Sequence, residues 1–283
     1  MPVLSETQKV LMRALISEGS FPIAKGRGLS QAGVYRCLER LEKLRVKNDG
    51  GTLRLIAEDD LPQDSSIARR CRLNSRLKAG AARFIIDQLM ERQAKGESCG
   101  PIFLDCGSAC AQVGSEIVAR RAPECRVVTN NPLVVREFAA APGLDRLWVL
   151  SGEVNWAKGS IHAPLEQLGH MDFDTAIIGT DLVSATAEIG LETPVGAELK
   201  QAVLNKSREI YFPVDQSKLR AHECAGAHLL SPPKECRKVV VVGVDSDCTA
   251  DVRSLLTKIR ESARQAGYEF YTVSPAGRVV DLA

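Results

Sequence analysis

The sequence predicts an α/β protein in which a parallel sheet, covered by helices on both faces, follows a small N-terminal domain. From residue 78 onward, short apolar runs alternate with segments of helical period, as in parallel sheets that are buried on both faces. Residues 1–78 carry 15 Lys and Arg against 9 Asp and Glu, and the remainder carries 22 against 26. A basic head on a mildly acidic body indicates a polyanion-binding domain joined to a second domain.

The basic head has the element order of a winged-helix domain. One helix is expected from Ser5 to about Ser17, and Ser30 can cap a second, amphipathic helix. The run Asn48-Asp49-Gly50-Gly51 predicts a hairpin between two short strands. We expect this domain to span residues 1–56 and to bind double-stranded DNA. The predicted DNA contacts come from the second helix and the hairpin: Ser30, Gln31, Tyr35, Arg36, Arg40 and Lys47.

Residues 57–77 are polar and have no sustained apolar period, so we predict a linker there. Its second half holds an arginine cluster, whose members could contact a DNA backbone or solvate a connecting helix; the second interpretation is slightly favoured. The cluster comprises Arg69, Arg70, Arg72 and Arg76.

The body, residues 78–283, should contain seven strands and five helices in alternation. The strands are expected at residues 101–105, 126–129, 147–150, 175–179, 210–214, 238–243 and 269–273. The helices are expected at residues 79–92, 109–121, 132–140, 195–206 and 251–267.

Ligands of parallel α/β sheets bind at the carboxyl ends of the strands. Five strands of the predicted sheet run into small, hydroxyl or amide residues, and the first is followed at once by a helix, whose N-terminus favours phosphate. These loops predict a small phosphorylated ligand. They begin at Asp105-Cys106-Gly107-Ser108, Thr129-Asn130-Asn131, Ser151-Gly152-Glu153, Gly179-Thr180-Asp181 and Asp215-Gln216-Ser217-Lys218.

The motif order of the body resembles the effector domain of DeoR-type transcription regulators. The resemblance rests on IFLDCGSACAQV, RVVTNNPLVV, LWVLSGEVNWAKGSIHAPL, FDTAIIGTDLV, GAELKQAVLNKS and FPVDQSKL, over roughly residues 72–275. The head segment LSQAGVYRCLERLEKLRVKNDGG is similar to the recognition helix and wing of the same family. The resemblance implies a ribose-phosphate-isomerase-like fold and a sugar-phosphate sensor that modulates DNA binding. It implies a cytoplasmic repressor of carbohydrate metabolism that forms a homo-oligomer.

Carried onto this sequence, the family pattern implies a set of ligand contacts. The phosphate loop is matched by Asp105, Gly107 and Ser108, although Ala109 and Cys110 stand where the family has a hydroxyl residue. Ser151 replaces the first of two paired glycines. The remaining matches are Thr129, Asn130, Gly152, Asp181, Glu198, Lys200, Asp215 and Lys218.

Two alternatives remain open. Asp181, Glu198 and Lys200 could serve a sugar-phosphate isomerase as acid, base and electrostatic partner, but residues 192–196 lack the KGGGA-like loop of ribose-5-phosphate isomerase. Ala109 and Ser151 would fit an interaction protein whose pocket is degenerate.

The remaining composition is that of a soluble protein without a cofactor. We find no signal peptide and no run of about 18 apolar residues. The nine cysteines include no CxxC pair, so we interpret them as reduced, small apolar residues of a cytoplasmic protein and expect no metal.

Overall fold

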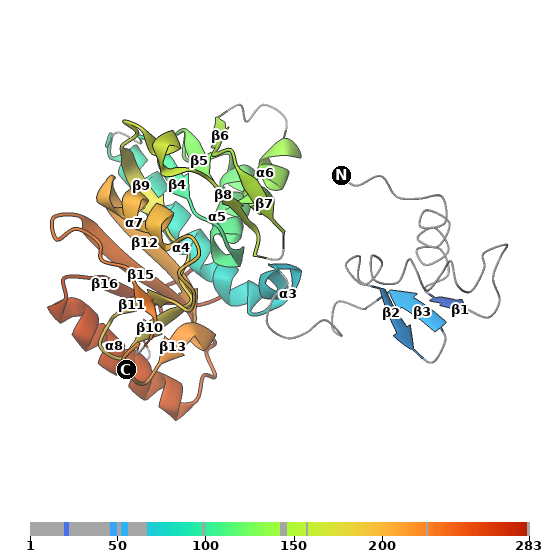
Figure 1. Cartoon of the computed structure of the whole chain (residues 1–283). Coiled ribbons are helices and arrows are strands. Elements are labelled where there is room, and N and C mark those ends of the chain that lie inside the picture. The colour runs from blue at the N-terminus through green and yellow to red at the C-terminus, as the bar shows by residue number, and fades with distance from the viewer. Residues whose placement is uncertain are drawn as a thin grey trace. The chain divides into compact units, whose positions relative to one another are not determined.

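The computed structural model describes residues 20–22, 46–49, 52–55, 67–97, 100–141, 146–156, 158–224 and 226–281. The chain divides into two compact units, Met1–Asp64 and Ser65–Ala283. Figure 1 shows the elements of each unit.

The described part of the first unit is a three-stranded sheet in the order β1-β3-β2. β2 (Val46–Asp49) and β3 (Thr52–Leu55) are antiparallel, and Asp49 lies opposite Thr52. This pairing confirms the predicted hairpin. The third strand, β1 (Ser20–Pro22), is antiparallel to β3 and was not predicted. Both helices predicted for the head lie outside the described residues, as do the DNA-contact residues predicted on the second one.

The second unit is an α/β domain whose main sheet has seven strands, all of the adjacent pairs being parallel. Its order is β16-β15-β12-β9-β4-β5-β6. The strands are β4 (Ile102–Leu104), β5 (Val127–Thr129), β6 (Leu147–Val149), β9 (Phe173–Ile177), β12 (Ser207–Asp215), β15 (Arg237–Gly243) and β16 (Glu269–Val273). The predicted parallel sheet is therefore confirmed.

Helices and short strands complete the domain. The helices are α3 (Ile67–Arg72), α4 (Ser75–Ala94), α5 (Ser108–Arg120), α6 (Pro132–Ala139), α7 (Ala197–Asn205) and α8 (Ala250–Gln265), with 3-10 turns η3 (Leu165–Leu168) and η4 (Gln216–Lys218). A second sheet has the order β13-β10-β11-β14, and β7 and β8 form a separate hairpin. These strands are β7 (Glu153–Asn155), β8 (Ser160–His162), β10 (Leu182–Ser184), β11 (Ile189–Leu191), β13 (Leu219–Arg220) and β14 (His228–Leu229).

Alternation along the strands divides the core into two layers. On β4, Ile102 and Leu104 pack with α4, α5 and α6, whereas Phe103 faces the layer that contains α7, α8 and the second sheet. All three residues are fully buried, which explains why this strand reads as a continuous apolar run. Both faces of the main sheet are thus covered.

The order of the main sheet creates a switch point between β4 and β9. After β4 the chain adds β5 and β6 on one side, and it then adds β9, β12, β15 and β16 on the other. Connections leave the carboxyl ends of β4 and β9 in opposite directions, and such a crevice is where ligands bind in open α/β sheets.

The sequence predictions missed the shortest elements. All seven strands and five helices predicted for the body are present, with small shifts at their ends. The second sheet and the β7–β8 hairpin were not predicted, because strands of two or three residues are too short to show a period. Within the predicted linker, residues 67–72 form α3, and α4 begins at Ser75, both in the second unit. No helix in the described ranges is long and apolar enough to cross a membrane.

Candidate functional site

A buried ion pair occupies the switch point. Asp105, directly after β4, is fully buried and pairs with Lys200, which is 5% exposed and comes from the first turn of α7. The Lys200 ammonium also donates to Gly179 O at 3.0 Å, and Gly179 N donates to Asp105 Oδ2 at 2.9 Å. Burial by itself lowers the pKa of Lys200, but the Asp105 carboxylate raises the pKa above its ordinary value. Lys200 is therefore a fixed cation.

The loop between β4 and α5 leaves a helix N-terminus uncapped. Gly107 is the N-cap of α5, with φ 105° and ψ 165°, and no side chain caps the helix. The first N–H groups of a helix have no partner within it, and a side chain at Gly107 would meet no atom within 4 Å. Ala109 and Cys110 are buried, so they can contribute only backbone N–H groups. This helix end can accept a phosphate without a hydroxyl side chain at either position.

Thr129 and Asn131 shape that loop from the end of β5. Thr129 Oγ1 donates to Leu104 O at 2.6 Å and accepts from Asn131 N at 3.0 Å. Asn131 Nδ2 donates to Asp105 O and Gly107 O, both at 3.0 Å, and its side-chain oxygen caps α6. Thr129, predicted as a ligand contact, is thus engaged within the protein. Asn131 holds the loop and was not among the predicted contacts.

Three buried side-chain atoms in the described part of the chain have no hydrogen-bond partner. They are Asp105 Oδ1, Asn130 Oδ1 and Arg70 Nε. An unpaired buried polar atom costs roughly 1–3 kcal/mol. Asp105 and Asn130 follow neighbouring parallel strands at the switch-point edge, so the two acceptors lie at the same edge of the sheet. Acceptors of this kind suit the hydroxyl groups of a ligand.

A second group of charges lies at the ends of β9 and β12. Lys218 of η4 donates to Thr180 O, and its pKa is lowered by burial and raised in part by Asp181 and Asp215. Asp215, at the end of β12, accepts from Asn74 Nδ2 at 2.7 Å and lies 3.9 Å from the Lys78 ammonium.

Lys78 links this group to α3. It is 3% exposed and donates to Arg70 O in the last turn of α3 and to Leu73 O just after that helix, at 2.5 and 2.6 Å. Burial lowers the pKa of Lys78 to about 8, although the Asp215 carboxylate opposes that shift. Lys78 is therefore a cation at neutral pH that can lose its proton in mild alkali.

Three other residues predicted as ligand contacts lie outside the Asp105–Lys200 ion pair and its hydrogen bonds. Glu198 is exposed on α7. Asp181 binds the protein's own backbone, because its Oδ2 accepts a hydrogen bond from Glu192 N at 3.1 Å. Gly152 is exposed and faces His162 O, which lies 2.0 Å from where a β-carbon would be. The glycine there allows the β7–β8 hairpin to close, which does not require a ligand.

Three residues near the site were not predicted as contacts: Arg70, Asn74 and Lys78. Arg70 and Asn74 fell in the predicted linker, and Lys78 opened an apolar helix. The one signal available was the lysine itself, which precedes the apolar run AGAARFII; a charge at the start of a buried helix face needs a partner. Within the described ranges no three metal-ligating side chains cluster.

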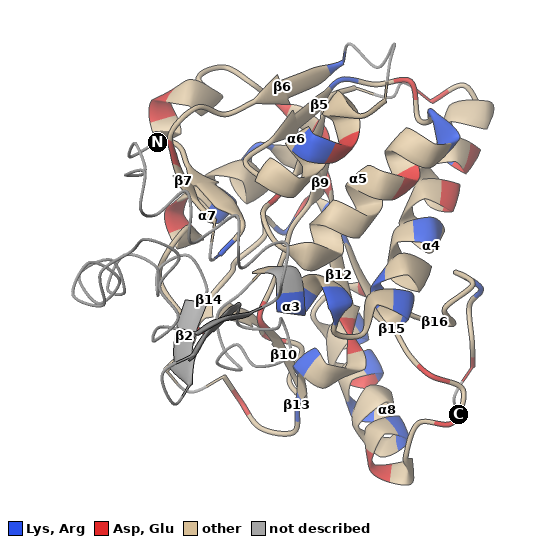
Figure 2. Cartoon of the chain, turned by 90° about the vertical axis from the view of Figure 1, so that its right-hand side faces the viewer, with Lys and Arg blue, Asp and Glu red and all other residues tan. Residues whose placement is uncertain are grey.

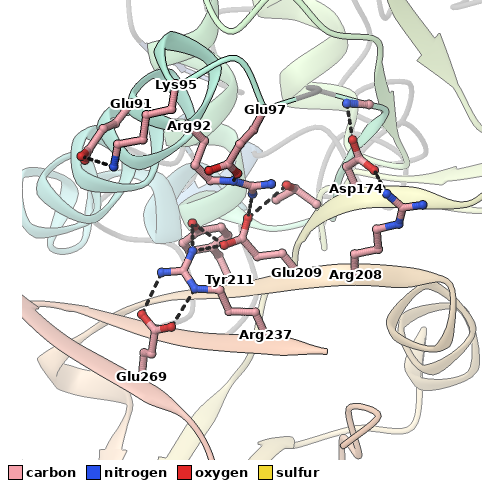
Figure 3. A network of polar contacts seen from close by, with 12 residues as sticks. Glu91, Arg92, Lys95, Glu97, Asp174, Arg208, Glu209, Tyr211, Arg237 and Glu269 are labelled. Carbon is pink, nitrogen blue, oxygen red and sulfur yellow. Dashed lines mark hydrogen bonds and ion pairs between the residues drawn. The ribbon is translucent and has the colours of Figure 1, made fainter. Parts of the chain in front are cut away.

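A cavity of about 440 Å³ lies at the opposite edge of the sheet, where the strands begin, and Glu209, Arg92 and Arg237 are among the residues that line it. Figure 3 shows the polar network beside it, in which Glu209, near the start of β12, is buried and paired with both Arg92 and Arg237. Arg237 also forms a two-bond pair with Glu269, at 2.7 and 2.8 Å. Because Glu209 and Glu269 already neutralise these arginines, this network is a structural one and not the candidate ligand site.

Residues 97–232 match the family model described as the DeoR C terminal sensor domain. No curated protein sequence matched the chain.

Several solved structures have partial likeness to the chain. Ribose 5-phosphate isomerase from Plasmodium falciparum is similar at 17% identity and a TM-score of 0.34, covering 50% of this chain and 52% of that one. Ribose 5-phosphate isomerase A from Methanocaldococcus jannaschii is similar at 17% identity and a TM-score of 0.37, covering 52% of this chain and 55% of that one. The eIF2B beta structure from Chaetomium thermophilum is similar at 10% identity and a TM-score of 0.33, covering 65% of this chain and 58% of that one. The chain therefore spans just over half the length of these isomerases.

Proposed function

We propose that this chain, whose residues 97–232 match the DeoR C-terminal sensor domain, is a DeoR-type transcription regulator that binds a phosphorylated sugar at the carboxyl edge of its main sheet. In this proposal residues 1–56 bind double-stranded DNA as a winged-helix domain, and sugar-phosphate binding modulates the DNA affinity. The protein acts as a cytoplasmic, homo-oligomeric repressor in carbohydrate metabolism, and not as an enzyme.

The observation that carries the ligand class is the set of unpaired groups at the switch point. An uncapped helix N-terminus at Gly107 suits a phosphate. Beside it, Asp105 Oδ1 and Asn130 Oδ1 are buried acceptors without donors. A phosphorylated polyol supplies both complements, since its phosphate accepts hydrogen bonds from N–H groups and its hydroxyls donate to the two oxygens.

The arrangement of charges favours binding over catalysis. Lys200, which could have acted as an electrostatic catalyst, is locked to Asp105, and Glu198 lies exposed outside the centre. A general acid or base must reach the proton that it transfers. The site is therefore suited to hold a sugar phosphate and to stabilise one arrangement of the domain, which shifts the population of DNA-binding states.

The proposal is tested by fluorescence anisotropy with labelled DNA from the region upstream of the coding gene. The full-length protein is titrated at two salt concentrations against this DNA and a scrambled duplex, and a panel of sugar phosphates is then added. We expect binding that prefers the upstream sequence, weakens with salt and shifts with one sugar phosphate. Equal affinity for both duplexes throughout would remove the regulator proposal for that region, and turnover of ribose 5-phosphate would favour an isomerase.

Replacing Gly107 with alanine should weaken sugar-phosphate binding by about tenfold or more. The φ of 105° with ψ of 165° is a region used almost exclusively by glycine, so a β-carbon costs roughly 1–3 kcal/mol or forces the loop to turn its N–H groups. Calorimetric titration measures the effect. The control is Gly96→Ala, which also has positive φ and open space but lies after α4. Unchanged affinity in Gly107→Ala would show that the phosphate does not bind at this helix end.

Affinity for the sugar phosphate should fall several-fold between pH 7 and pH 9. Lys78, with a pKa of about 8, loses its proton in this range, and the lowered pKa of Lys218 acts in the same direction. Asp215, Cys71 and Arg70 are the other charged or titratable groups that act on Lys78. Titration at pH 7, 8 and 9 tests this, and Lys78→Met should flatten the profile.

Deprotonation of Lys78 does not unfold the protein between pH 7 and pH 9, so unfolding would not explain the expected loss of sugar-phosphate affinity. Because its pKa is lower in the folded state than the ordinary 10.5, the unfolded chain binds more protons between about pH 8 and 10.5. The contribution of Lys78 to stability therefore rises with pH in that window. An affinity that stays constant to pH 9 would contradict a role for this lysine in anion binding.

A further inference from the structure

Arg70 of α3 is held in place by two hydrogen bonds, one to its backbone oxygen and one from its guanidinium. Its backbone oxygen accepts from Lys78, and its Nη2 donates to Lys158 O at 2.7 Å in the loop between β7 and β8. The neighbouring Ile67 packs against Gly159, whose β-carbon, if present, would lie 2.5 Å from Ile67 Cγ1. The helix is therefore fitted closely against the β7–β8 loop.

The other side of the guanidinium is unsatisfied. Arg70 Nε is buried and has no hydrogen-bond partner among the described residues. Arg70 is also close to the candidate site, because α3 packs against α5 and because its charge acts on Cys106, Lys78 and Lys218. Cys106 directly precedes Gly107. A buried guanidinium N–H near the uncapped end of α5 needs an acceptor, and none of the described residues supplies one.

We propose that Arg70 is a ligand contact whose Nε donates to an oxygen of the phosphorylated ligand held at the start of α5, so that α3 responds directly to the ligand. This inference rests on the proposed function, and it adds a contact outside the matched sensor region of residues 97–232. Arginine suits the role because its planar fork can bind the Lys158 carbonyl and a phosphate oxygen at once.

The position of α3 gives the contact a regulatory consequence. α3 is the first described helix of the second unit, which begins at Ser65 after the N-terminal unit ends at Asp64. Lys78 donates to Arg70 O in the last turn of α3 and to Leu73 O just after it. Asn74, in the left-handed region at φ 53°, donates to Asp215 at the end of β12. Figure 2 shows the basic residues of α3 and α4 in this part of the domain. A ligand that binds Arg70 thus acts on the segment that follows the proposed DNA-binding domain in the chain.

The experiment uses full-length wild-type protein and the variants Arg70→Gln, Arg70→Lys and Arg72→Gln. Calorimetric titration with ribose 5-phosphate and five further sugar phosphates first identifies the member that wild type binds most tightly, and all of the variants are then titrated with it. Arg72 is exposed on the same helix, so Arg72→Gln removes the same charge from an exposed position of α3. Circular dichroism confirms that each variant is folded.

We expect Arg70→Gln to bind the chosen sugar phosphate at least tenfold more weakly and Arg70→Lys at least fivefold more weakly, with Arg72→Gln within twofold of wild type. In the anisotropy assay, Arg70→Gln should bind the upstream DNA but respond to the sugar phosphate only at correspondingly higher concentration. If Arg70→Gln does not fold, Arg70→Lys decides.

Two results would overturn the inference, and they are distinguishable. If wild type binds a sugar phosphate and the Arg70 variants bind it within twofold, Arg70 is not a ligand contact although the proposed function stands. If wild type binds none of the six compounds, the proposed function and this inference both fail.

Discussion

Replacing Lys200 with methionine should lower the free energy of unfolding by about 3–5 kcal/mol. The substitution removes the cation that neutralises the fully buried Asp105 carboxylate, together with the hydrogen bond to Gly179 O. A buried charge that has lost its partner is strongly destabilising, and it can escape only by taking up a proton or by local unfolding. Urea denaturation followed by circular dichroism measures the loss.

The double variant Asp105→Asn with Lys200→Met separates the charge effect from the change in packing. Removing both charges should restore part of the stability, because no unpaired charge stays in the core. Lys258→Met on the exposed face of α8 is the control and should change the unfolding free energy by less than about 0.5 kcal/mol. A double variant no more stable than Lys200→Met would show that the ion pair is not what Lys200 contributes.

Replacing Glu209 with glutamine should lower the free energy of unfolding by roughly 2–4 kcal/mol, at the far edge of the sheet. Glu209 is 3% exposed and holds Arg92, Arg237 and the Tyr211 hydroxyl. The amide can accept but turns one donor toward the arginines. The loss is below that of a fully buried pair, because both arginines keep access to water and Arg237 keeps Glu269.

A matched pair on the same surface serves as the control for Glu209. Glu91 in the last turn of α4 and Lys95, the residue that caps that helix, form an exposed pair at 2.8 Å. Glu91→Gln should leave the denaturation midpoint unchanged. Sugar-phosphate affinity of Glu209→Gln, measured below its unfolding midpoint, should equal that of wild type. Weaker binding in this variant would place part of the ligand site in the cavity beside Glu209.

The local patterns in the sequence were enough to predict the elements of the main sheet. The buried strands are short apolar runs, and β4, β5 and β15 are each followed by a helix, so both signals come from neighbours in the chain. The loop at Asp105–Ser108 was predicted for the same reason, since a strand, a glycine and a helix follow one another directly. The short strands of the second sheet had no comparable signal in the sequence.

The sequence alone predicted the parallel sheet, the hairpin of the head and several residues at the carboxyl edge. Only the tertiary structure paired Asp105 with Lys200, placed Arg70 and Lys78 beside the site, and showed that Glu198 lies outside it. The physical reason is that periodicity and turn chemistry depend on residues a few positions apart, whereas pairing depends on strand order. Because β9 packs beside β4 and not beside β6, groups separated by 95 residues in the chain share one buried site.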